Sequence, residues 1–451
     1  MTREQYDRYT ILELRTILAG LGGAPANKKK SVLIDEIKRI RDDGEDPVRS
    51  KRGRPSVRKT HAEDLLATLN DDIYYRVSDR NTGEEAIIVP VVGILDVNSG
   101  GSFLRKLDCT AAAIDTRVSQ KFINEDFLIS GDKIIGMAKN EPKRFMELVS
   151  IQAVNDAEKR TKPAPKFSSL EIFPLLERFN YSDYNSDLAA IDLIYPMAKG
   201  QRSLLTVPEN CDRLGFMTDL ARCYLESGAK VVYLGVDYKA EDVAQVKYSL
   251  GPKAEVDCLT FDTSLEELIC SVNTVFKRVE SLAISGHDVF LVVDCLYQLV
   301  KAYKEYEEEK RGTPCPLEKA VLAVKKLLSV SRNLGDNYIS LLAVCPMPSD
   351  ESTHADCQKI IKGIKDMCSA SLVFDAKLNR KRIYPPINLD QSYCENFDRF
   401  LTEKDLACYD VIAEYLEDDS ARYEDVLKTL KKYGKSDRLY ERLKELLSAR
   451  D

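Results

Sequence analysis

The strongest constraint on the fold is a regular alternation of apolar runs and amphipathic segments between residues 199 and 390. The apolar runs predict strands at Ser203–Val207, Lys230–Val236, Asp257–Thr260, Val289–Asp294, Tyr338–Val344 and Ala370–Asp375. Apolar residues at helical spacing predict helices over Phe216–Ser227, Glu241–Ser249, Leu265–Ile284 and Leu317–Leu334. Because apolar strands that alternate with helices are typical of a parallel sheet covered on both faces, we predict an α/β core here.

The first of these strands leads into a turn and a helix within Gln201–Leu214, where a phosphate-binding loop would lie in a nucleotide-binding core. Such a loop needs glycines whose N–H groups surround the phosphates, a Lys for the β- and γ-phosphates, and a Ser or Thr for Mg²⁺. After Pro208, this chain carries Asp212, Arg213 and Leu214 at the Gly-Lys-Ser/Thr positions. A carboxylate repels phosphate and a leucine cannot bind Mg²⁺, so the stretch predicts a scaffold that has lost its ATP chemistry.

Composition narrows the classes of function. A chain of 451 residues with 44% apolar content can form about two to four folded domains. Its net charge of −7 gives no overall nucleic-acid signature, so such contacts must come from local basic segments. Twelve cysteines without C-x-x-C pairs and only three histidines favour free thiols over a metal site. The polar N-terminus and the lack of a long apolar run predict a cytoplasmic protein with no signal peptide and no membrane partner.

Residues 1–45 predict a small module of two helices, interrupted at Gly22-Gly23. Three consecutive lysines, Lys28-Lys29-Lys30, precede the second helix, and the overall pattern resembles SAP-type modules. Lysines at a turn and a helix start either contact phosphates or form only a solvated turn, and the sequence leaves both interpretations open.

Residues 46–61 predict a basic linker, because six of the eleven residues from Arg49 to Lys59 are Lys or Arg. The linker contains Arg52, Gly53 and Arg54, followed by a proline, which resembles the core of an AT-hook. In that motif two arginines enter the narrow minor groove of A/T-rich DNA. The linker therefore predicts groove insertion, non-specific phosphate contact, or a plain spacer.

Residues 62–156 predict a domain dominated by β-structure, after a short helix at Ala62–Leu69 and a strand at Ile73–Val77. Apolar runs cut by Gly, Asn and Asp predict five further strands, at Ile87–Ile94, Phe103–Leu104, Phe127–Ile129, Ile134–Met137 and Met146–Val154. Short strands of this kind fit an OB-type barrel, which is a common platform for single-stranded nucleic acid.

Four segments of this region are similar to the RNA-binding domain of the transcription termination factor Rho family: GILDVNSGGSFLR (93–105), DTRVS (115–119), FLISGDKIIG (127–136) and ELVSIQAVN (147–155). The resemblance implies that Phe103, Arg105, Asp115 and Arg117 contact RNA. Gly101 and Arg117 stand where the family has base-stacking aromatic residues. An arginine can still stack on a base through its guanidinium plane. The alternative is that Phe103 belongs to the barrel core.

The resemblance continues through a connector (157–198) and into the α/β core, which resembles the RecA-type motor of Rho. Asp237 and Tyr238 stand at the first two positions of the family's Asp-Glu-Arg, so Tyr238 replaces the Glu that activates water. Ala376 stands at the arginine-finger position. Asp294 ends the Walker B strand, where it could approach Mg²⁺ or, as we favour, cap the next helix.

Two loops that line the central pore in the family also depart from its pattern. Gly312–Pro316 replaces a Gly-rich loop, and Asp350–Cys357 lacks the usual Lys. Phosphate loop, catalytic base, pore loops and finger are thus altered together in a scaffold that otherwise matches. The resemblance implies a pseudo-ATPase with no catalytic residue, no metal and no cofactor; ATP and Mg²⁺ are expected only if it remains an active ATPase.

Residues 391–451 predict charged helices, at Leu406–Leu416, Tyr423–Leu430 and Leu439–Leu447, and resemble the end of the Rho chain. The predicted protein is therefore multidomain α/β, with a helical SAP-like module, an OB-type β-barrel over 62–156, a RecA-like parallel core over 199–390 and a helical C-terminus over 391–451.

The resemblance implies a Rho-like protein that binds single-stranded RNA and acts in transcription termination or its regulation without its own ATP hydrolysis. Its expected partners are RNA, further copies of itself or a mixed ring with an active Rho hexamer, and RNA polymerase. One alternative is an ATP-dependent RNA translocase or helicase. Another is an architectural protein that binds A/T-rich DNA, and a third is a structural oligomer without a nucleic-acid role.

Overall fold

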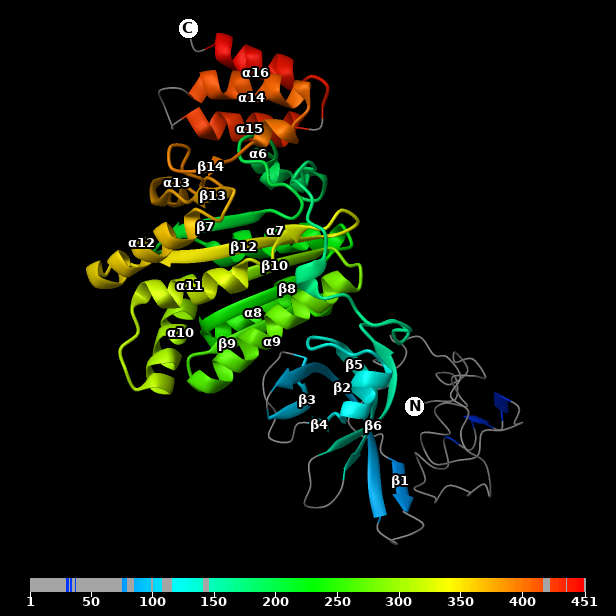
Figure 1. Ribbon diagram of the computed structural model, residues 1–451. Coiled ribbons are helices and arrows are strands. Elements are labelled where there is room, and N and C mark those ends of the chain that lie inside the picture. The colour runs from blue at the N-terminus through cyan, green and yellow to red at the C-terminus, as the bar shows by residue number, and fades with distance from the viewer. Residues whose placement is uncertain are drawn as a thin grey trace. The chain divides into compact units, whose positions relative to one another are not determined.

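The computed structural model describes residues 75–78, 85–98, 100–107, 116–140, 146–416, 422–434 and 436–449, together with Lys30, Ser31, Leu33, Ile34 and Ile37 (Figure 1). The linker residues Arg52, Gly53 and Arg54, the expected helix at 62–69 and the RNA-binding candidate Asp115 lie outside the described residues. The chain divides into two compact units, one of Met1–Arg105, Ala112–Leu128 and Lys133–Lys162, the other of Lys106–Ala111, Ile129–Asp132 and Pro163–Asp451.

The first unit contains a small β-barrel. Its elements are β1 (Tyr75–Ser78), β2 (Glu85–Asn98), β3 (Gly101–Arg105), β4 (Thr116–Arg117), α5 (Gln120–Glu125), β5 (Lys133–Asn140) and β6 (Glu147–Val154). The strand order is β1-β2-β3-β4-β6-β5, and an additional pairing of β2 with β5 closes five of the strands into a ring. Inward side chains, among them Leu95, Leu104, Ile134 and Leu148, form its core.

The predicted strand at Phe127–Ile129 is wrong. These residues follow α5 in a turn in which Phe127 has a positive φ of 51°, and the Leu128 N–H donates to the Ile123 carbonyl at 3.0 Å. The Leu128 side chain is buried in the barrel core. A short apolar run does not reveal by its periodicity whether it is a strand or a buried turn.

The second unit is built on a sheet with the order β14-β13-β7-β12-β10-β8-β9, and β11 pairs with β12 beside this path. The strands are β7 (Arg202–Pro208), β8 (Lys230–Tyr238), β9 (Glu255–Thr260), β10 (Val289–Asp294), β11 (Arg332–Asn333), β12 (Tyr338–Met347), β13 (Ala370–Val373) and β14 (Tyr393–Cys394). All pairings between β13 and β9 along the order are parallel, as predicted. The two short strands are antiparallel to their neighbours, β11 to β12 and β14 to β13.

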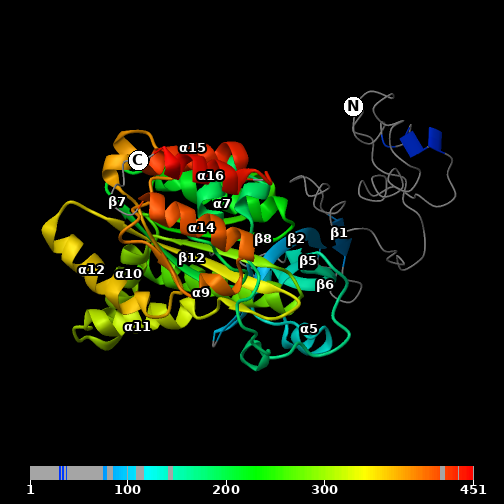
Figure 2. The same ribbon diagram turned by 90° about the horizontal axis from the view of Figure 1, so that it is seen from above.

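Helices cover both faces of this sheet. They are α7 (Arg213–Glu226), α8 (Ala240–Leu250), α9 (Leu265–Ile284), α10 (Leu296–Arg311), α11 (Leu317–Leu328), α12 (Glu351–Lys365) and the short α13 (Ala376–Arg380). Figure 2 shows α7 on one side of the sheet and α10 and α12 on the other. Because it is covered on both faces, β10 is buried at every position and its apolar sequence needs no alternation.

The helix predicted over Leu317–Leu334 is wrong at its C-terminal end. It stops at Leu328, since Arg332 and Asn333 form β11 against the beginning of β12. Gly335 makes the tight turn between these strands with a φ of 86°, a conformation that glycine adopts without a steric cost.

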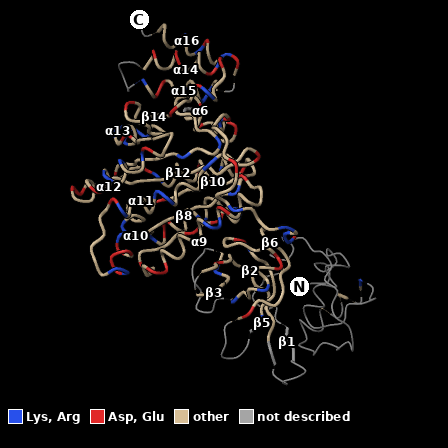
Figure 3. Tube along the Cα trace, in the orientation of Figure 1, with Lys and Arg blue, Asp and Glu red and all other residues tan. Residues whose placement is uncertain are grey.

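The connector and the C-terminus complete this unit. The connector contains η1 (Phe167–Ser169), η2 (Tyr181–Asp183), η3 (Ser186–Leu188) and α6 (Ala189–Leu193). Two further 3₁₀ helices lie outside it: η4 (Gly251–Lys253) follows α8, and η5 (Phe397–Arg399) precedes the C-terminal helices. The predicted C-terminal helices are α14 (Glu403–Leu416), α15 (Tyr423–Tyr433) and α16 (Leu439–Ser448). Figure 3 shows that Lys, Arg, Asp and Glu are interspersed along them, and several form ion pairs such as Lys428–Glu424 at 2.8 Å. Within the described part of the chain, no helix is long and apolar enough to span a membrane.

Candidate functional site

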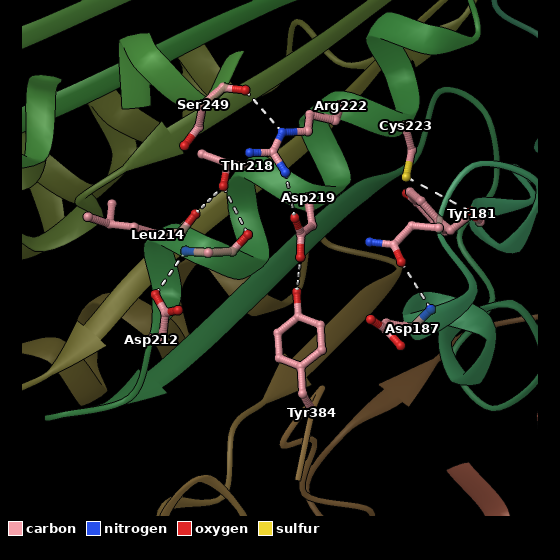
Figure 4. A network of polar contacts seen from close by, with 12 residues as sticks. Tyr181, Asp187, Asp212, Leu214, Thr218, Asp219, Arg222, Cys223, Ser249 and Tyr384 are labelled. Carbon is pink, nitrogen blue, oxygen red and sulfur yellow. Dashed lines mark hydrogen bonds and ion pairs between the residues drawn. The ribbon is translucent and has the colours of Figure 1, made fainter. Parts of the chain in front are cut away.

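The N-terminus of α7 lies where the phosphate-binding loop was expected. The side chain of Asp212 accepts a hydrogen bond from the Gly215 N–H at 2.9 Å and caps the helix (Figure 4). Helix N-termini attract anions because their first N–H groups are unpaired and the helix dipole is positive there. Here the protein's own carboxylate takes the place that a phosphate group would need.

The loop between β7 and α7 is held from both sides. The Glu209 N–H donates to the Met347 carbonyl at 3.1 Å, and the Glu209 carboxylate accepts hydrogen bonds from the Ser349 N–H and hydroxyl. On the other side, the Asn379 amide donates to the Asn210 carbonyl at 3.1 Å. The polar groups of the loop are therefore hydrogen-bonded to the end of β12, to the turn that follows it and to α13.

Asp294, at the end of β10, is the centre of a buried polar cluster. Arg213 Nε lies 2.9 Å from Asp294 Oδ2, with side-chain exposures of 29% for the arginine and 0% for the aspartate. The Tyr238 hydroxyl donates to the same oxygen, and it lies 2.9 Å from the Tyr233 hydroxyl. Three residues from the expected nucleotide site, Arg213, Tyr238 and Asp294, thus bind one another.

A bulge in β8 directs Tyr238 inward. Asp237 has a positive φ of 62° and is exposed, and the pairing register with β9 shifts between Val236 and Tyr238. Without the extra residue, strand alternation would place Tyr238 on the opposite side of the sheet from its present one. The bulge therefore turns the Tyr238 side chain toward Asp294.

The electrostatics of the cluster favour its internal pairing. Burial raises the pKa of Asp294, while Arg213 and the Tyr238 hydroxyl oppose that rise. Burial alone would lower the pKa of Arg213, but the Asp294 carboxylate reverses this and raises it. Burial and Asp294 also raise the pKa of Tyr238, so it remains a hydrogen-bond donor.

The expectation that Asp294 caps the following helix is wrong. Helix α10 begins after Cys295, which occupies the cap position, and no side-chain hydrogen bond caps it. The second oxygen of Asp294, Oδ1, is buried without a hydrogen-bond partner among the described residues. The aspartate is therefore held by Arg213 and Tyr238 rather than by the helix.

The other predicted site residues do not join this cluster. Leu214 is buried in the core, and its carbonyl accepts a hydrogen bond from the Thr218 hydroxyl at 2.8 Å. Pro208 ends β7. Ala376 begins α13, which is capped by the Asp375 side chain. None of these three side chains carries a polar group that could hold a phosphate or a metal.

A second polar network holds α7 through Asp219 and Arg222, in the middle and second half of the helix (Figure 4). The sequence analysis did not predict this network. The Tyr384 hydroxyl donates to Asp219 at 2.7 Å, and Arg222 Nη1 donates to the same carboxylate at 3.2 Å. Arg222 Nε also donates to the Ser249 carbonyl at the end of α8. These contacts fix α7 along its length, and no sequence motif marks them.

These residues do not fit a nucleoside triphosphate with its Mg²⁺. The helix N-terminus holds the Asp212 carboxylate, and the position of the metal-binding hydroxyl is Leu214. Arg213 and Asp294, which were expected at the lysine position and at the end of the Walker B strand, are bound to each other.

The outer face of the barrel holds the other predicted site. Along β3, Ser102 and Leu104 are buried, while Phe103 and Arg105 face outward and are half-buried. Leu104 belongs to the barrel core and Phe103 does not. The alternative interpretation, in which Phe103 is a core residue, is therefore wrong.

Phe103 lies between charged neighbours on the adjacent strands. It is the direct partner of Asp96 on β2 and of Arg117 on β4. Arg105 donates to Asp96 Oδ2 through Nε at 3.1 Å and through Nη2 at 2.8 Å, and its guanidinium lies 5.8 Å from the Phe103 ring centroid. A Cβ added at Gly101 would lie 3.1 Å from the Phe103 ring. The sequence analysis did not predict Asp96, because its place beside Phe103 depends on the register between β2 and β3.

Two protein-family models match the chain. The model "Rho termination factor, RNA-binding domain" matches residues 91–160, which include the barrel face just described. The model "ATP synthase alpha/beta family, nucleotide-binding domain" matches residues 187–394, which include the Asp294 cluster.

Curated relatives match over most of the chain. Transcription termination factor Rho of Streptomyces lividans is 26% identical over 387 residues, covering 81% of this chain and 52% of that protein. The Rho of Mycobacterium tuberculosis strain H37Rv is 24% identical over 343 residues, covering 72% and 56%. The Rho of Pseudomonas aeruginosa is 23% identical over 402 residues, covering 85% and 94%. The chain thus spans about half the length of the first two relatives.

One solved structure has a fold similar to that of this chain. An ATPase from the type III secretion system of pathogenic bacteria superposes with a TM-score of 0.50 at 14% identity, over 68% of this chain and 93% of that one. At this level of identity the likeness concerns the fold alone.

Proposed function

Since this chain belongs to the Rho family of transcription termination factors, we propose that it binds single-stranded RNA and acts in termination or its regulation without hydrolysing ATP itself. The observation that carries the proposal is the cluster of Arg213, Tyr238 and Asp294. In this cluster the chain's own side chains bind one another, so these groups are not available for ATP hydrolysis.

The energetics support this proposal. Separating Arg213 from the fully buried Asp294 would leave an unpaired charge, at a cost of about 3–5 kcal/mol. ATP binding would have to supply that energy and displace the Asp212 cap as well. The loss of an arginine finger at Ala376 would by itself reduce phosphoryl transfer by roughly 10³–10⁵. Residual binding of nucleotide is therefore not expected to lead to turnover.

RNA binding is supported by the barrel. Phe103 faces outward beside the exposed Arg117, and stacking of one base on an aromatic side chain contributes about 1–3 kcal/mol. With Gly101 and Arg117 in place of aromatic residues, fewer bases can stack than on a platform that keeps all of them. We expect measurable binding with a strong dependence on salt.

The test is a parallel titration of the full chain with a fluorescent ATP analogue and with single-stranded RNA at one fixed salt concentration, followed by an ATPase assay with Mg²⁺ and RNA. We expect RNA binding, weak or no nucleotide binding and no hydrolysis. Phe103→Ala is the control for RNA bound at the barrel. RNA-stimulated hydrolysis would overturn the proposal and favour an ATP-dependent translocase.

We further propose that the chain assembles with itself or with an active Rho, and in a mixed ring lowers the ATPase activity of that partner. The support is chemical, because a subunit without a finger or phosphate loop supplies no working half-site to its neighbours. Titration of this chain into active Rho should lower RNA-stimulated ATPase activity progressively. Unchanged activity at excess would contradict a mixed ring and leave action through RNA or RNA polymerase.

The basic linker raises the alternative that the chain binds A/T-rich duplex DNA. Arg52, Gly53 and Arg54 resemble an AT-hook core. Competition between an A/T-rich duplex and single-stranded RNA measures which nucleic acid the chain prefers. A preference for the duplex that disappears with Arg52→Ala and Arg54→Ala would favour an architectural DNA-binding protein over the proposal.

A further inference from the structure

We propose that Arg117 gives the barrel a preference for guanine at the position where a base stacks on Phe103. This inference rests on the proposed RNA binding and concerns which base the same face selects. It depends on three features of that face: one outward aromatic ring, one arginine already bound within the protein, and one arginine that is not.

Arg117 is placed to reach a base on Phe103. The two residues are direct cross-strand partners on β3 and β4, so their Cβ atoms lie about 5 Å apart. The Arg117 side chain is exposed. It makes no hydrogen bond or ion pair with any residue that the structure describes. Its guanidinium can therefore reach the edge of a base that lies against the Phe103 ring.

The charged neighbours of Phe103 on β2 and β3, Asp96 and Arg105, are bound to each other. Asp96 Oδ2 accepts from Arg105 Nε, Arg105 Nη2 and the Asn98 amide, at 3.1, 2.8 and 3.0 Å. Arg105 is thereby turned toward Asp96, and that oxygen already has three donors. The exocyclic amino groups of adenine and cytosine are donors, and Oδ2 has little capacity left for them. Arg117, in contrast, offers donors only.

Guanine matches this arrangement better than the other bases. Its O6 and N7 are two adjacent acceptors that suit the forked donors of an arginine. Cytosine also has two neighbouring acceptors, O2 and N3, but its single ring covers less of the aromatic face. Because Gly101 supplies no second aromatic ring, the contact area on Phe103 matters more, and a purine gains from it.

The test uses the full chain and short oligouridine RNAs with one central G, A, C or 7-deazaguanosine, compared by fluorescence anisotropy at one salt concentration. The single G avoids quadruplex formation. We expect the G oligonucleotide to bind at least about fivefold more tightly than the C oligonucleotide. Replacing N7 by carbon removes one acceptor, so 7-deazaguanosine should lose most of that preference while stacking equally well.

Matched variants separate base reading from general binding. Arg117→Lys keeps the charge but not the forked donors, so it should bind the guanosine and 7-deazaguanosine RNAs with similar affinity. Phe103→Ala should weaken all of them. A preference for guanosine over 7-deazaguanosine that survives in Arg117→Lys, equal binding of these two RNAs by the unsubstituted chain, or tighter binding of C would each overturn the inference while RNA binding itself stands. Absence of binding to any RNA would overturn the proposed function and this inference together.

Discussion

The two predicted sites of this protein have opposite electrostatic designs. At the edge of the core sheet, Arg213 and Asp294 bind each other, and the aspartate is fully buried. On the barrel, the Arg117 side chain is exposed and makes no hydrogen bond or ion pair with a described residue. A side chain can bind a ligand only with groups that the protein has not already used. We therefore expect ligand binding at the barrel face and not at the paired residues of the core.

A substitution should also have different effects in the buried Arg213–Asp294 pair and at the exposed Arg117 side chain. Removal of one partner from a buried pair leaves an uncompensated charge and lowers stability. Removal of an exposed side chain leaves stability nearly unchanged and affects only binding. The two regions should thus respond to substitution in different measurements, and this difference can be tested.

The largest effect is expected for Arg213→Met. It leaves Asp294 buried with only the Tyr238 hydrogen bond, so the free energy of unfolding should fall by about 3 kcal/mol in urea denaturation. Arg222→Met is a matched control on the same helix, because its ion pair with Asp219 is more exposed; we expect it to cost less than about 1 kcal/mol.

The double variant Arg213→Met, Asp294→Leu shows whether the loss comes from the buried charge. Replacing both partners of a buried pair by apolar residues is often neutral. We expect the double variant to recover at least half of the stability that the single variant loses. A double variant less stable than Arg213→Met would mean that Asp294 stabilises the core in another way.

The stability difference between wild type and Arg213→Met should depend on pH. Arg213 opposes the rise in the pKa of Asp294 that burial causes, so its loss raises that pKa further. A group whose pKa is raised in the folded state loses stability as pH increases through that pKa. The destabilisation by Arg213→Met should therefore grow as the pH rises above about 4, the ordinary pKa of an aspartate side chain. A constant difference would show that Asp294 does not titrate with folding.

On the barrel, two neighbours on one strand provide the contrasting test. Phe103→Ala removes an outward ring, so RNA affinity should fall by about 1–3 kcal/mol with little change in thermal stability. Leu104→Ala removes a core side chain, so the free energy of unfolding should fall by about 2–5 kcal/mol. Loss of stability in Phe103→Ala comparable to that in Leu104→Ala would contradict the outward placement.

Most of the core could be predicted from the sequence, because strands buried on both faces are continuous apolar runs. Val289–Asp294 and Leu265–Ile284 have the predicted bounds. Errors arose where local pattern and tertiary packing disagree. Phe127–Ile129 reads as a strand but turns into the barrel core, and the helix after Leu317 ends where β11 pairs with β12.

The candidate site was predictable by position but not by contact. The sequence identified Asp212, Arg213, Tyr238 and Asp294 as departures from a nucleotide site. Arg213 and Tyr238 are 81 and 56 residues from Asp294. Tyr238 reaches it because β8 pairs directly with β10, and Arg213 reaches it from the first residue of α7, which packs against β10. Neither the strand order nor the bulge that turns Tyr238 inward has a local signal in the sequence.

Tyr238→Phe should have a smaller effect than Arg213→Met. The ring remains in place, but Asp294 and Tyr233 each lose a hydrogen-bond partner. We expect the free energy of unfolding to fall by about 1–2 kcal/mol. Tyr248→Phe on α8, where the tyrosine is 92% exposed, is the control and should leave stability unchanged. Equal stability of both variants would show that the tyrosine does not hold Asp294.

The smallest effect is expected at the N-terminus of α7. Asp212→Ala removes the hydrogen bond to the Gly215 N–H, so it should cost about 1 kcal/mol, whereas Asp212→Asn keeps a capping oxygen and should cost less.

The same pair of variants asks which feature closes the site to phosphate. With Asp212 gone, the helix N–H groups become available to an anion, but Arg213 and Asp294 remain paired. We therefore expect neither ATP with Mg²⁺ nor inorganic phosphate to raise the melting temperature of Asp212→Ala. If phosphate stabilises Asp212→Ala but not Asp212→Asn, the cap alone excludes the ligand. The difference between the two regions would then depend on one side chain rather than on the buried cluster.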